Sequence, residues 1–369
     1  KGILDKARGT LFFDIMQIVK AKHPKYLILE NVRNLTGPKH SETWKLIIES
    51  IREEGYTVSG IPTILSPHLI PKELGGAPQV RDRVFIAATL NGKNEPLYIE
   101  RESYKHNHNP DNWNIAEYLL PDNTVSQSES LSNYRLTQEE LTWLNAWDYL
   151  VSKLDSNTLP GFPIWADALT SNPIIEDDMP LWKKNFLIKN SNFYITNKKF
   201  LDKWKNIVWK PANKKIEEFP MSRQKFEWQA RKVFPTKKNR TIKSLVLQFR
   251  PSGIRVKPAS YLPALVAITQ TSIVGPNIRD GIKHFRKITP IEASKLQGID
   301  GSIFKKAGVP DSVAYKQLGN GVNTGVVKYV FSQLCEDDNY FNESNFRFDE
   351  KRKLINKYKK SQNLSFKFL

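Results

Sequence analysis

The sequence has very little cysteine and histidine, and it has no long apolar run. Cys335 is the single cysteine among 369 residues, so a disulfide within the chain is excluded and the reducing cytoplasm is the expected compartment. With six histidines beside that one thiol, we expect no zinc site. No run of about 18 apolar residues is present, so we expect no membrane-spanning helix and a soluble protein.

Acidic residues are also scarce relative to basic ones. Asp and Glu total 38 against 56 Lys and Arg, which gives a formal charge of +18. Such an excess favours a polyanionic partner, and nucleic acid is the leading candidate. The alternative is a basic surface that serves only solubility. The length is compatible with two domains of ordinary size.

The first 90 residues have the rhythm of an α/β sheet. Residues 10–22 carry apolar side chains at helical spacing. Residues 26–30, YLILE, are too short for a helix and apolar on both faces, which predicts a central parallel strand. A second helix is expected from Ser41, as its N-cap, to Gly55, followed by strands in YTVSGIPTIL and RVFIAATL.

Glu30 lies at the end of the first of these strands. In α/β sheets ligands bind at the carboxyl ends of the strands, so a carboxylate there is a candidate for the active site. The alternative is an acid that caps the following turn.

Residues 91–280 have a different residue composition and pattern. Eight of the nine tryptophans lie between Trp113 and Trp228, interleaved with Lys and Arg. We expect most of these rings to form the core and the basic side chains, especially those of residues 200–245, to contact nucleic acid. The α/β texture then returns, with a short helix predicted from Thr289 and another helix after a Gly-Asn-Gly turn.

Five segments, taken in order, resemble the motifs of the DNA cytosine-5 methyltransferases of bacterial restriction-modification systems. They are LDKARGTLFFDIMQIV at 4–19, LENV at 29–32, PQVRDR at 78–83, RKITPIEASKLQGI at 286–299 and YKQLGNGVN at 315–323. Each motif is weak alone, but five in this order and spacing are specific.

The resemblance implies an α/β fold: a partial Rossmann-like, S-adenosylmethionine-dependent methyltransferase domain interrupted by a loop-rich target-recognition domain. Residues 1–90 would be the second half of the catalytic domain, and residues 91–280 the recognition domain that binds double-stranded DNA. Residues 281–335 would return to the catalytic domain, and residues 336–369 would form a charged C-terminal tail.

The family's chemistry gives the candidate catalytic residues their roles. Such an enzyme flips a cytosine out of the duplex and adds a cysteine thiolate at C6, which drives negative charge toward N3 and O2. By resemblance, Glu30 serves N3 and Arg83 serves O2. Arg81 and Gln79 would brace the pocket, with Arg81 also placed to reach the DNA backbone.

The resemblance also implies the methyl donor, S-adenosylmethionine. Leu11 would pack on its adenine, while Asn320 and Gly321 would border its methionine end. The alternative for Leu11 is a core residue. For Gly-Asn-Gly we expect a tight turn with positive φ as well as contact with the cofactor.

Two parts of the family pattern are absent from the sequence: the Pro-Cys loop that bears the nucleophile, and the Gly-rich cofactor turn. Cys335 is expected to be an inert thiol in an apolar setting. We therefore expect an N-terminal part to be missing and this chain alone to be inactive. Three explanations stay open: a longer chain, a second chain that supplies the missing half, or a non-catalytic protein that only binds DNA.

Overall fold

The computed structural model describes residues 10–90, 113–128, 130–228, 240–265 and 271–334. The chain divides into two compact units. Unit 1 comprises residues 1–113, 296–299 and 321–369, and unit 2 comprises residues 114–295 and 300–320.

The division concerns compactness, and the expected domain boundaries stay a prediction. Most of residues 281–320, which we expected to return to the catalytic domain, belong to unit 2. Within unit 2, the buried Arg286 side chain bonds to Asp122 and Glu292.

Unit 1 is built around one small sheet. Its strands are β1 (Tyr26–Val32), β2 (Tyr56–Val58), β3 (Thr63–Leu65) and β5 (Arg83–Leu90). The short strand β4 (Gln79–Val80) is not part of this sheet. In the sheet β5 is central, with β1 on one side and β2 and β3 on the other. The helices of this unit are α1 (Thr10–Lys22), α2 (Ser41–Glu53) and α12 (Thr324–Leu334).

The expectation that β1 is paired in parallel is wrong for the described residues. β1, β2 and β3 each pair antiparallel with β5. The chain leaves β3 at Leu65 and enters β5 at Arg83, and these two residues are register partners. Because β5 begins where β3 ends, it must run in the opposite direction.

Both predicted helices of this region are confirmed, with small differences. The N-cap of α2 is His40, and Ser41 already has helical backbone angles. Gly55, just after α2, has φ of 84°, as expected for a residue that ends a helix. The single strand expected in YTVSGIPTIL is two strands, β2 and β3, because Pro62 between them has no N–H to give to a ladder.

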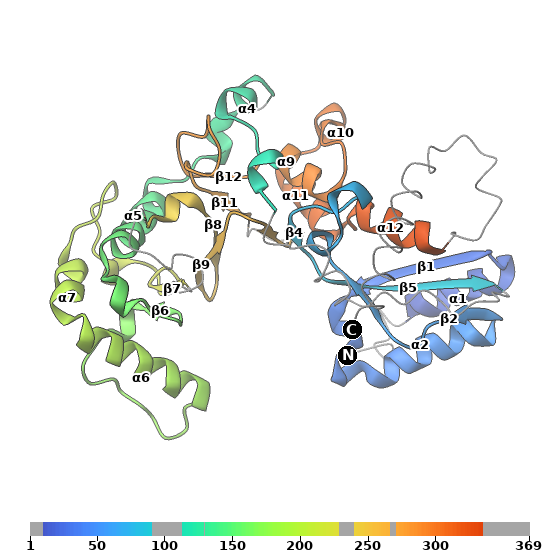
Figure 1. Ribbon diagram of the computed structural model, residues 1–369, viewed down its shortest axis with the longest axis horizontal. Helices are drawn as coiled ribbons and strands as arrows, with labels where there is room; N and C mark the ends of the chain where they lie inside the picture. The colour runs from blue at the N-terminus through green and yellow to red at the C-terminus, as the bar shows by residue number, and fades with distance from the viewer. Residues whose placement is uncertain (1–9, 91–112, 129, 229–239, 266–270, 335–369) are drawn as a thin grey trace, which may run out of the picture. The chain divides into compact units, whose positions relative to one another are not determined.

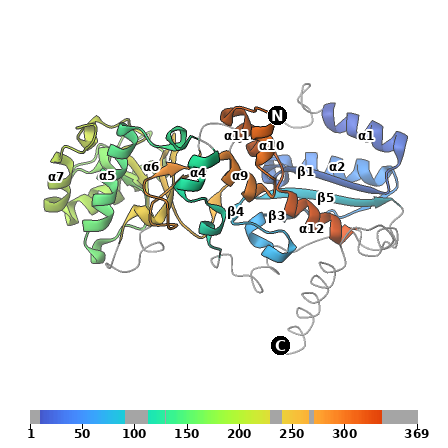
Figure 2. The same cartoon turned by 90° about the horizontal axis from the view of Figure 1, so that it is seen from above.

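The sheet of unit 1 is covered on both faces (Figures 1 and 2). One face packs on α1 and α2 through Met16, Val19 and Ile51. The other face packs on α12 through Val326 and Val330. These helices hold the strands rigidly, and the strand ends are therefore suitable places for functional side chains.

Unit 2 contains a second, larger sheet with the order β12-β11-β8-β9-β7-β6. Its strands are β6 (Ile164–Trp165), β7 (Lys225–Glu227), β8 (Leu245–Arg250), β9 (Gly253–Pro258), β11 (Ile273–Val274) and β12 (Arg286–Lys287). A further short strand is β10 (Leu262–Pro263). Its helices before β7 are α4 (Asp122–Ser128), α5 (Gln138–Lys153), α6 (Leu181–Thr196) and α7 (Lys198–Asn206).

The core of unit 2 is rich in aromatic rings, which confirms the expectation for the tryptophans. Trp147, Trp204 and Trp228 are fully buried, and the Trp147 ring stacks on Phe226 at 4.7 Å between centroids. Trp182 is the exception, with 59% of its surface exposed.

Three more helices precede α12: α9 (Pro290–Gln297), α10 (Ser302–Lys306) and α11 (Asp311–Asn320). α9 confirms the short helix predicted from Thr289. The Gly-Asn-Gly segment is not the expected turn with positive φ: Gly319 and Asn320 end α11, and neither Gly319 nor Gly321 has a positive φ. Helical hydrogen bonding thus extends to the start of this segment.

Among the residues that the structure describes, no helix is long and apolar enough to cross a bilayer.

Candidate active site

The candidate site of unit 1 is built on two neighbouring strands. Glu30 lies in β1 opposite Phe85 of β5, and Arg83 lies opposite Val32. Glu30 and Arg83 are therefore diagonal neighbours two positions apart, and their side chains emerge on the same face of the sheet. This is the face that α12 covers farther along the strands.

The side chains of Glu30 and Arg83 are in direct contact. Arg83 Nε donates to Glu30 Oε1 at 2.8 Å, and the two side chains are 20% and 25% exposed. Arg83 Nη1 also donates to the backbone carbonyl of Asp82 at 3.0 Å. The Asp82 carboxylate in turn accepts from Arg33, just after β1, at 2.7 Å. The pair is thus held in place yet still reachable from solvent.

Arg81 is buried beside this pair, with 2% of its surface exposed. Its backbone N–H donates to Ser66 Oγ at 2.8 Å, and its Nη2 donates to the carbonyl of Gly321 at 2.6 Å. Burial, together with repulsion from Arg83, lowers the pKa of Arg81 to about 10, against the opposing effect of Glu30. The two arginines and the carboxylate therefore share one electrostatic environment.

Glu30 has an unusual acidity for a residue next to two arginines. Burial raises the pKa of its carboxyl above the ordinary 4.5, and the Arg83 and Arg81 guanidinium groups only partly counteract this. A raised pKa makes the protonated, hydrogen-bond-donating form of the carboxyl more accessible.

Gln79, near the start of the PQVRDR motif at 78–83, is completely buried. Neither its side-chain nitrogen nor its side-chain oxygen has a hydrogen-bond partner in the part of the chain that the structure describes. Burying an amide without partners costs free energy, so such a group in a candidate site marks a place where a ligand can bind. The role of Gln79 in bracing the pocket stays a prediction.

The three expected cofactor residues are placed differently from one another. Leu11 in α1 exposes 65% of its surface, so it is not a core residue. Gly321 is held by Arg81 through its carbonyl. Asn320 is exposed and belongs to unit 2, whereas Leu11 and Gly321 belong to unit 1.

One positioning residue was not predicted from the sequence. Ser66 is fully buried, its hydroxyl receives the Arg81 N–H, and it also bonds to His68 Nδ1 at 2.8 Å. A single serine in a loop carries no pattern that would single it out. Its role follows only from the fold.

Basic and aromatic side chains are interleaved on unit 2. Lys225 Nζ lies 4.7 Å from the centre of the Trp165 ring, and the Arg223 guanidinium lies 4.9 Å from the Phe249 ring. Lys203, Lys210 and Lys243, all within residues 200–245, are exposed. Such cations are suited to phosphate contacts.

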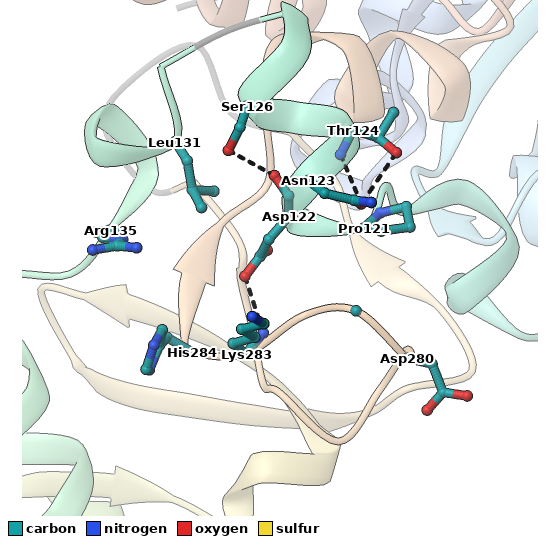
Figure 3. A pocket seen from close by; sticks show the side chains of 11 residues that line it. Pro121, Asp122, Asn123, Thr124, Ser126, Leu131, Arg135, Asp280, Lys283 and His284 are labelled. Atoms are coloured by element: carbon teal, nitrogen blue, oxygen red, sulfur yellow. Dashed lines mark hydrogen bonds between the residues drawn. The ribbon is translucent and has the colours of Figure 1, made fainter.

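Unit 2 also has a pocket of about 680 Å³ (Figure 3). Its lining includes Arg135, Lys283 and His284, together with Asp122 and Asp280. The Asp122 carboxylate accepts from the Lys283 backbone N–H at 3.0 Å and from Arg286. This acid is therefore used internally, and the pocket contains none of the site residues predicted from the sequence.

The chain belongs to the family of C-5 cytosine-specific DNA methylases, whose pattern matches residues 1–336. Members of this family use S-adenosylmethionine as the methyl donor. The match does not support the expectation that an N-terminal part is missing.

Two relatives by sequence agree with this assignment. The Type II methyltransferase M.AluI of Cellulosimicrobium cellulans is 35% identical over 90% of this chain and 75% of its own length. M.BanI of Aneurinibacillus aneurinilyticus, also a Type II methyltransferase, is 27% identical over 90% of this chain and 76% of its own. Among solved structures, the S. pombe Dnmt2 methyltransferase aligns with a TM-score of 0.40 and 16% identity, covering 92% of this chain and 76% of that one.

Proposed function

We propose that this chain carries the base-holding half of the active site for methyl transfer from S-adenosylmethionine to C5 of a flipped cytosine in duplex DNA. The observation that carries the proposal is the contact of Glu30 with Arg83 at 2.8 Å, beside buried Arg81. An acid and a guanidinium that converge from two strands match the N3 and O2 edge of cytosine.

The proposed mechanism uses the two groups where charge develops. Attack of a thiolate at C6 places negative charge on N3 and O2, so donors fixed at these atoms stabilise the transition state more than the ground state. Glu30, with its raised pKa, supplies a proton to N3, and the Arg83 guanidinium holds O2. Arg81, locked to Gly321, keeps the pocket positive.

The unpartnered amide of Gln79 supports a ligand at this site. Both of its polar side-chain atoms are buried without hydrogen bonds among the described residues. A substrate group or a neighbouring segment that bonds to them would remove the cost of burying an unpaired amide, and its binding would be stabilised. For the cofactor, Leu11 offers an exposed apolar face to the adenine, and Gly321 a half-buried backbone to the methionine end. When bound, S-adenosylmethionine supplies the electrophilic methyl group.

The test is a pair of matched variants in protein made from the whole gene. Glu30→Ala should lower kcat by roughly 10²–10⁴-fold, because the proton donor at N3 is lost. Binding of duplex DNA should stay largely intact. Glu49→Ala, which removes an exposed carboxylate of α2, is the control and should change neither quantity. Normal turnover of Glu30→Ala would remove Glu30 from the mechanism.

We further propose that Cys335 is not the nucleophile and that this chain alone does not methylate DNA. Cys335 is its only cysteine and lies outside the described residues. β1, which carries Glu30, pairs on one edge only, with β5, among the described strands, so its other edge is available to a further strand. A longer chain or a second chain could supply both the strand and the thiolate.

Covalent capture on duplex DNA with 5-fluorocytosine at the target distinguishes these cases. If the nucleophile lies on another segment, the Cys335→Ser variant made from the whole gene forms the covalent adduct with the DNA to the same extent as the parent protein. Loss of capture in Cys335→Ser would make Cys335 the nucleophile. The second candidate function, a protein that only binds DNA, predicts retention of the duplex with no covalent adduct under any condition.

We also propose that unit 2 recognises the DNA and that its exposed lysines contact phosphates. Replacing Lys203, Lys210 and Lys243 by Gln should weaken duplex binding and reduce the slope of log K against log salt by about 1 for each phosphate that is no longer neutralised. The control replaces Lys20, Lys22 and Lys45, exposed lysines of unit 1, and should leave the slope nearly unchanged. Equal effects in both triple variants would contradict a dedicated recognition unit.

A further inference from the structure

α6 of unit 2 has an exposed apolar stripe that the proposed function does not use. Its inner face is buried through Asn190, Phe193 and Tyr194. On the outer face, Leu181, Ile188 and Ile195 expose 73%, 43% and 53% of their surfaces. The helix lies at the periphery of unit 2 (Figure 1).

The stripe has a regular spacing. Leu181, Ile188 and Ile195 are seven residues apart, and Asn185 and Asn192, both exposed, lie between them. Positions separated alternately by four and three residues form the seam by which helices pair in coiled coils. Over 16 residues the helix is about 24 Å long, so the seam has three apolar layers and two amide layers.

The apolar positions of the seam coincide when the helix is reversed about Ile188, because Leu181 and Ile195 each lie seven residues from it. In an antiparallel pair with a two-fold axis at Ile188, this residue meets its own copy, and Leu181 meets Ile195 of the second copy. Asn185 and Asn192 of the second copy are then offset by one residue, about 1.5 Å along the axis, and their amides can donate to and accept from one another. Such self-complementarity is what an isologous two-fold interface requires.

The charges at the two ends of α6 are also complementary in this arrangement. Glu176, Asp177 and Asp178 are exposed before the first turn, and Lys198 and Lys199 are exposed after the last. Antiparallel pairing brings the acidic end of one copy to the basic end of the other. The same acidic cluster would repel phosphates, which disfavours DNA as the occupant of this face.

We propose that the outer face of α6 is a docking surface for a second copy of this chain, paired antiparallel about Ile188. One helix pair is small beside the roughly 1,200–2,000 Å² of a standard interface, so the dimer is weak, with a dissociation constant in the micromolar range. Its formation increases the local concentration of recognition units on DNA and is independent of the proposed methyl transfer.

Sedimentation equilibrium of the full chain over a wide concentration range tests the proposal. Ile188→Glu sets two carboxylates against each other on the axis and should weaken the dimer at least tenfold. Met221→Glu introduces the same charge at an exposed apolar residue off the stripe, with 58% of its surface exposed, and should not change the dissociation constant.

A charge exchange separates pairing from misfolding. Asp177→Lys and Lys199→Asp should each weaken the dimer, and the double variant should restore it, because each end then again faces the opposite charge. A monomer at every concentration overturns the proposal. So does a loss of duplex DNA binding in Ile188→Glu without any change in mass, which would assign the face to DNA instead.

Discussion

The two units each contain a buried arginine near carboxylates, and the two arginines differ in almost every other respect. Arg286 of unit 2 makes two parallel bonds to Glu292, at 2.7 and 2.8 Å, and a third to Asp122 at 3.1 Å. Burial acts to lower the pKa of Arg286, but its bonds to Glu292 and Asp122 raise it overall. For Arg81 of unit 1, burial prevails and lowers the pKa to about 10.

The difference separates a structural network in unit 2 from the proposed active site in unit 1. Glu292 is fully buried and also accepts from the backbone N–H groups of Leu120 and Thr289, so its oxygens are saturated. Glu30 is a quarter exposed, its pKa is raised, and the nearby Gln79 has no hydrogen-bond partner among the described residues. Unit 1 therefore retains an unsatisfied polar site, which a ligand can complete.

The largest expected effect is on Arg286. Arg286→Met leaves two buried carboxylates without a counter-charge and should destabilise unit 2 by about 3–5 kcal/mol. Glu30→Gln removes a partly exposed pair and should change the stability of unit 1 by less than about 1 kcal/mol. Hydrogen exchange of the amides in each unit measures both.

Lys287→Met serves as the control for the neighbouring position, because its amine lies 3.9 Å from Glu140 and is partly exposed. Lys287→Met should change the stability of unit 2 very little. If Glu30→Gln proved as destabilising as Arg286→Met, the distinction between the two networks would be lost.

Substitution of Gln79 should stabilise the protein, whereas substitution of Arg286 should destabilise it. Gln79→Leu replaces an amide without partners among the described residues by an apolar group and should stabilise unit 1 by about 1–2 kcal/mol while turnover falls. The matched control is Gln248→Leu in unit 2, where the amide donates to Ser272 Oγ, so the same change should destabilise the protein. Thermal unfolding and initial rates give both quantities, and a destabilised Gln79→Leu would argue against an orphaned amide.

The smallest effect concerns the titration of Glu30. Arg83→Ala removes a guanidinium that lowers the pKa of Glu30 and should raise this pKa further. Arg33→Ala removes the partner of Asp82 instead and should leave the pKa of Glu30 unchanged. Carbon-13 NMR of the carboxyl group follows the titration.

The stability of the protein should depend on pH through the protonation of the Glu30 carboxyl. Because the folded carboxyl binds its proton more tightly than the unfolded one, Glu30 adds stability as the pH falls through its folded pKa. This contribution is lost as the pH rises, and Glu30→Gln should abolish that dependence. A Glu30 carboxyl that titrates at or below 4.5 would contradict the proposed proton donor.

Local patterns predicted the elements of unit 1 well and their pairing poorly. The apolar stripe of residues 10–22 and the helix after Ser41 depend on spacing within one segment, and both appear as α1 and α2. An apolar strand covered on both faces has the same sequence signature whether its neighbour is parallel or antiparallel. The direction of β5 was therefore not predictable from its residues.

The candidate site was predicted from motifs, but its geometry was not. Nothing in the sequence gives the register that sets Glu30 two positions from the partner of Arg83. The assignment of Arg286 to unit 2 depends on Asp122, which is 164 residues away. Long-range contacts of this kind have no local signature.

The hydrogen bond from Arg81 to Gly321 joins residues that are 240 positions apart in the chain. Because synthesis proceeds from the N-terminus, Arg81 leaves the ribosome long before the carbonyl that anchors it. A nascent chain therefore emerges before the surroundings of Arg81 are complete. The hydrogen bond between Arg81 and Gly321 can form only after translation has passed the Gly321 codon.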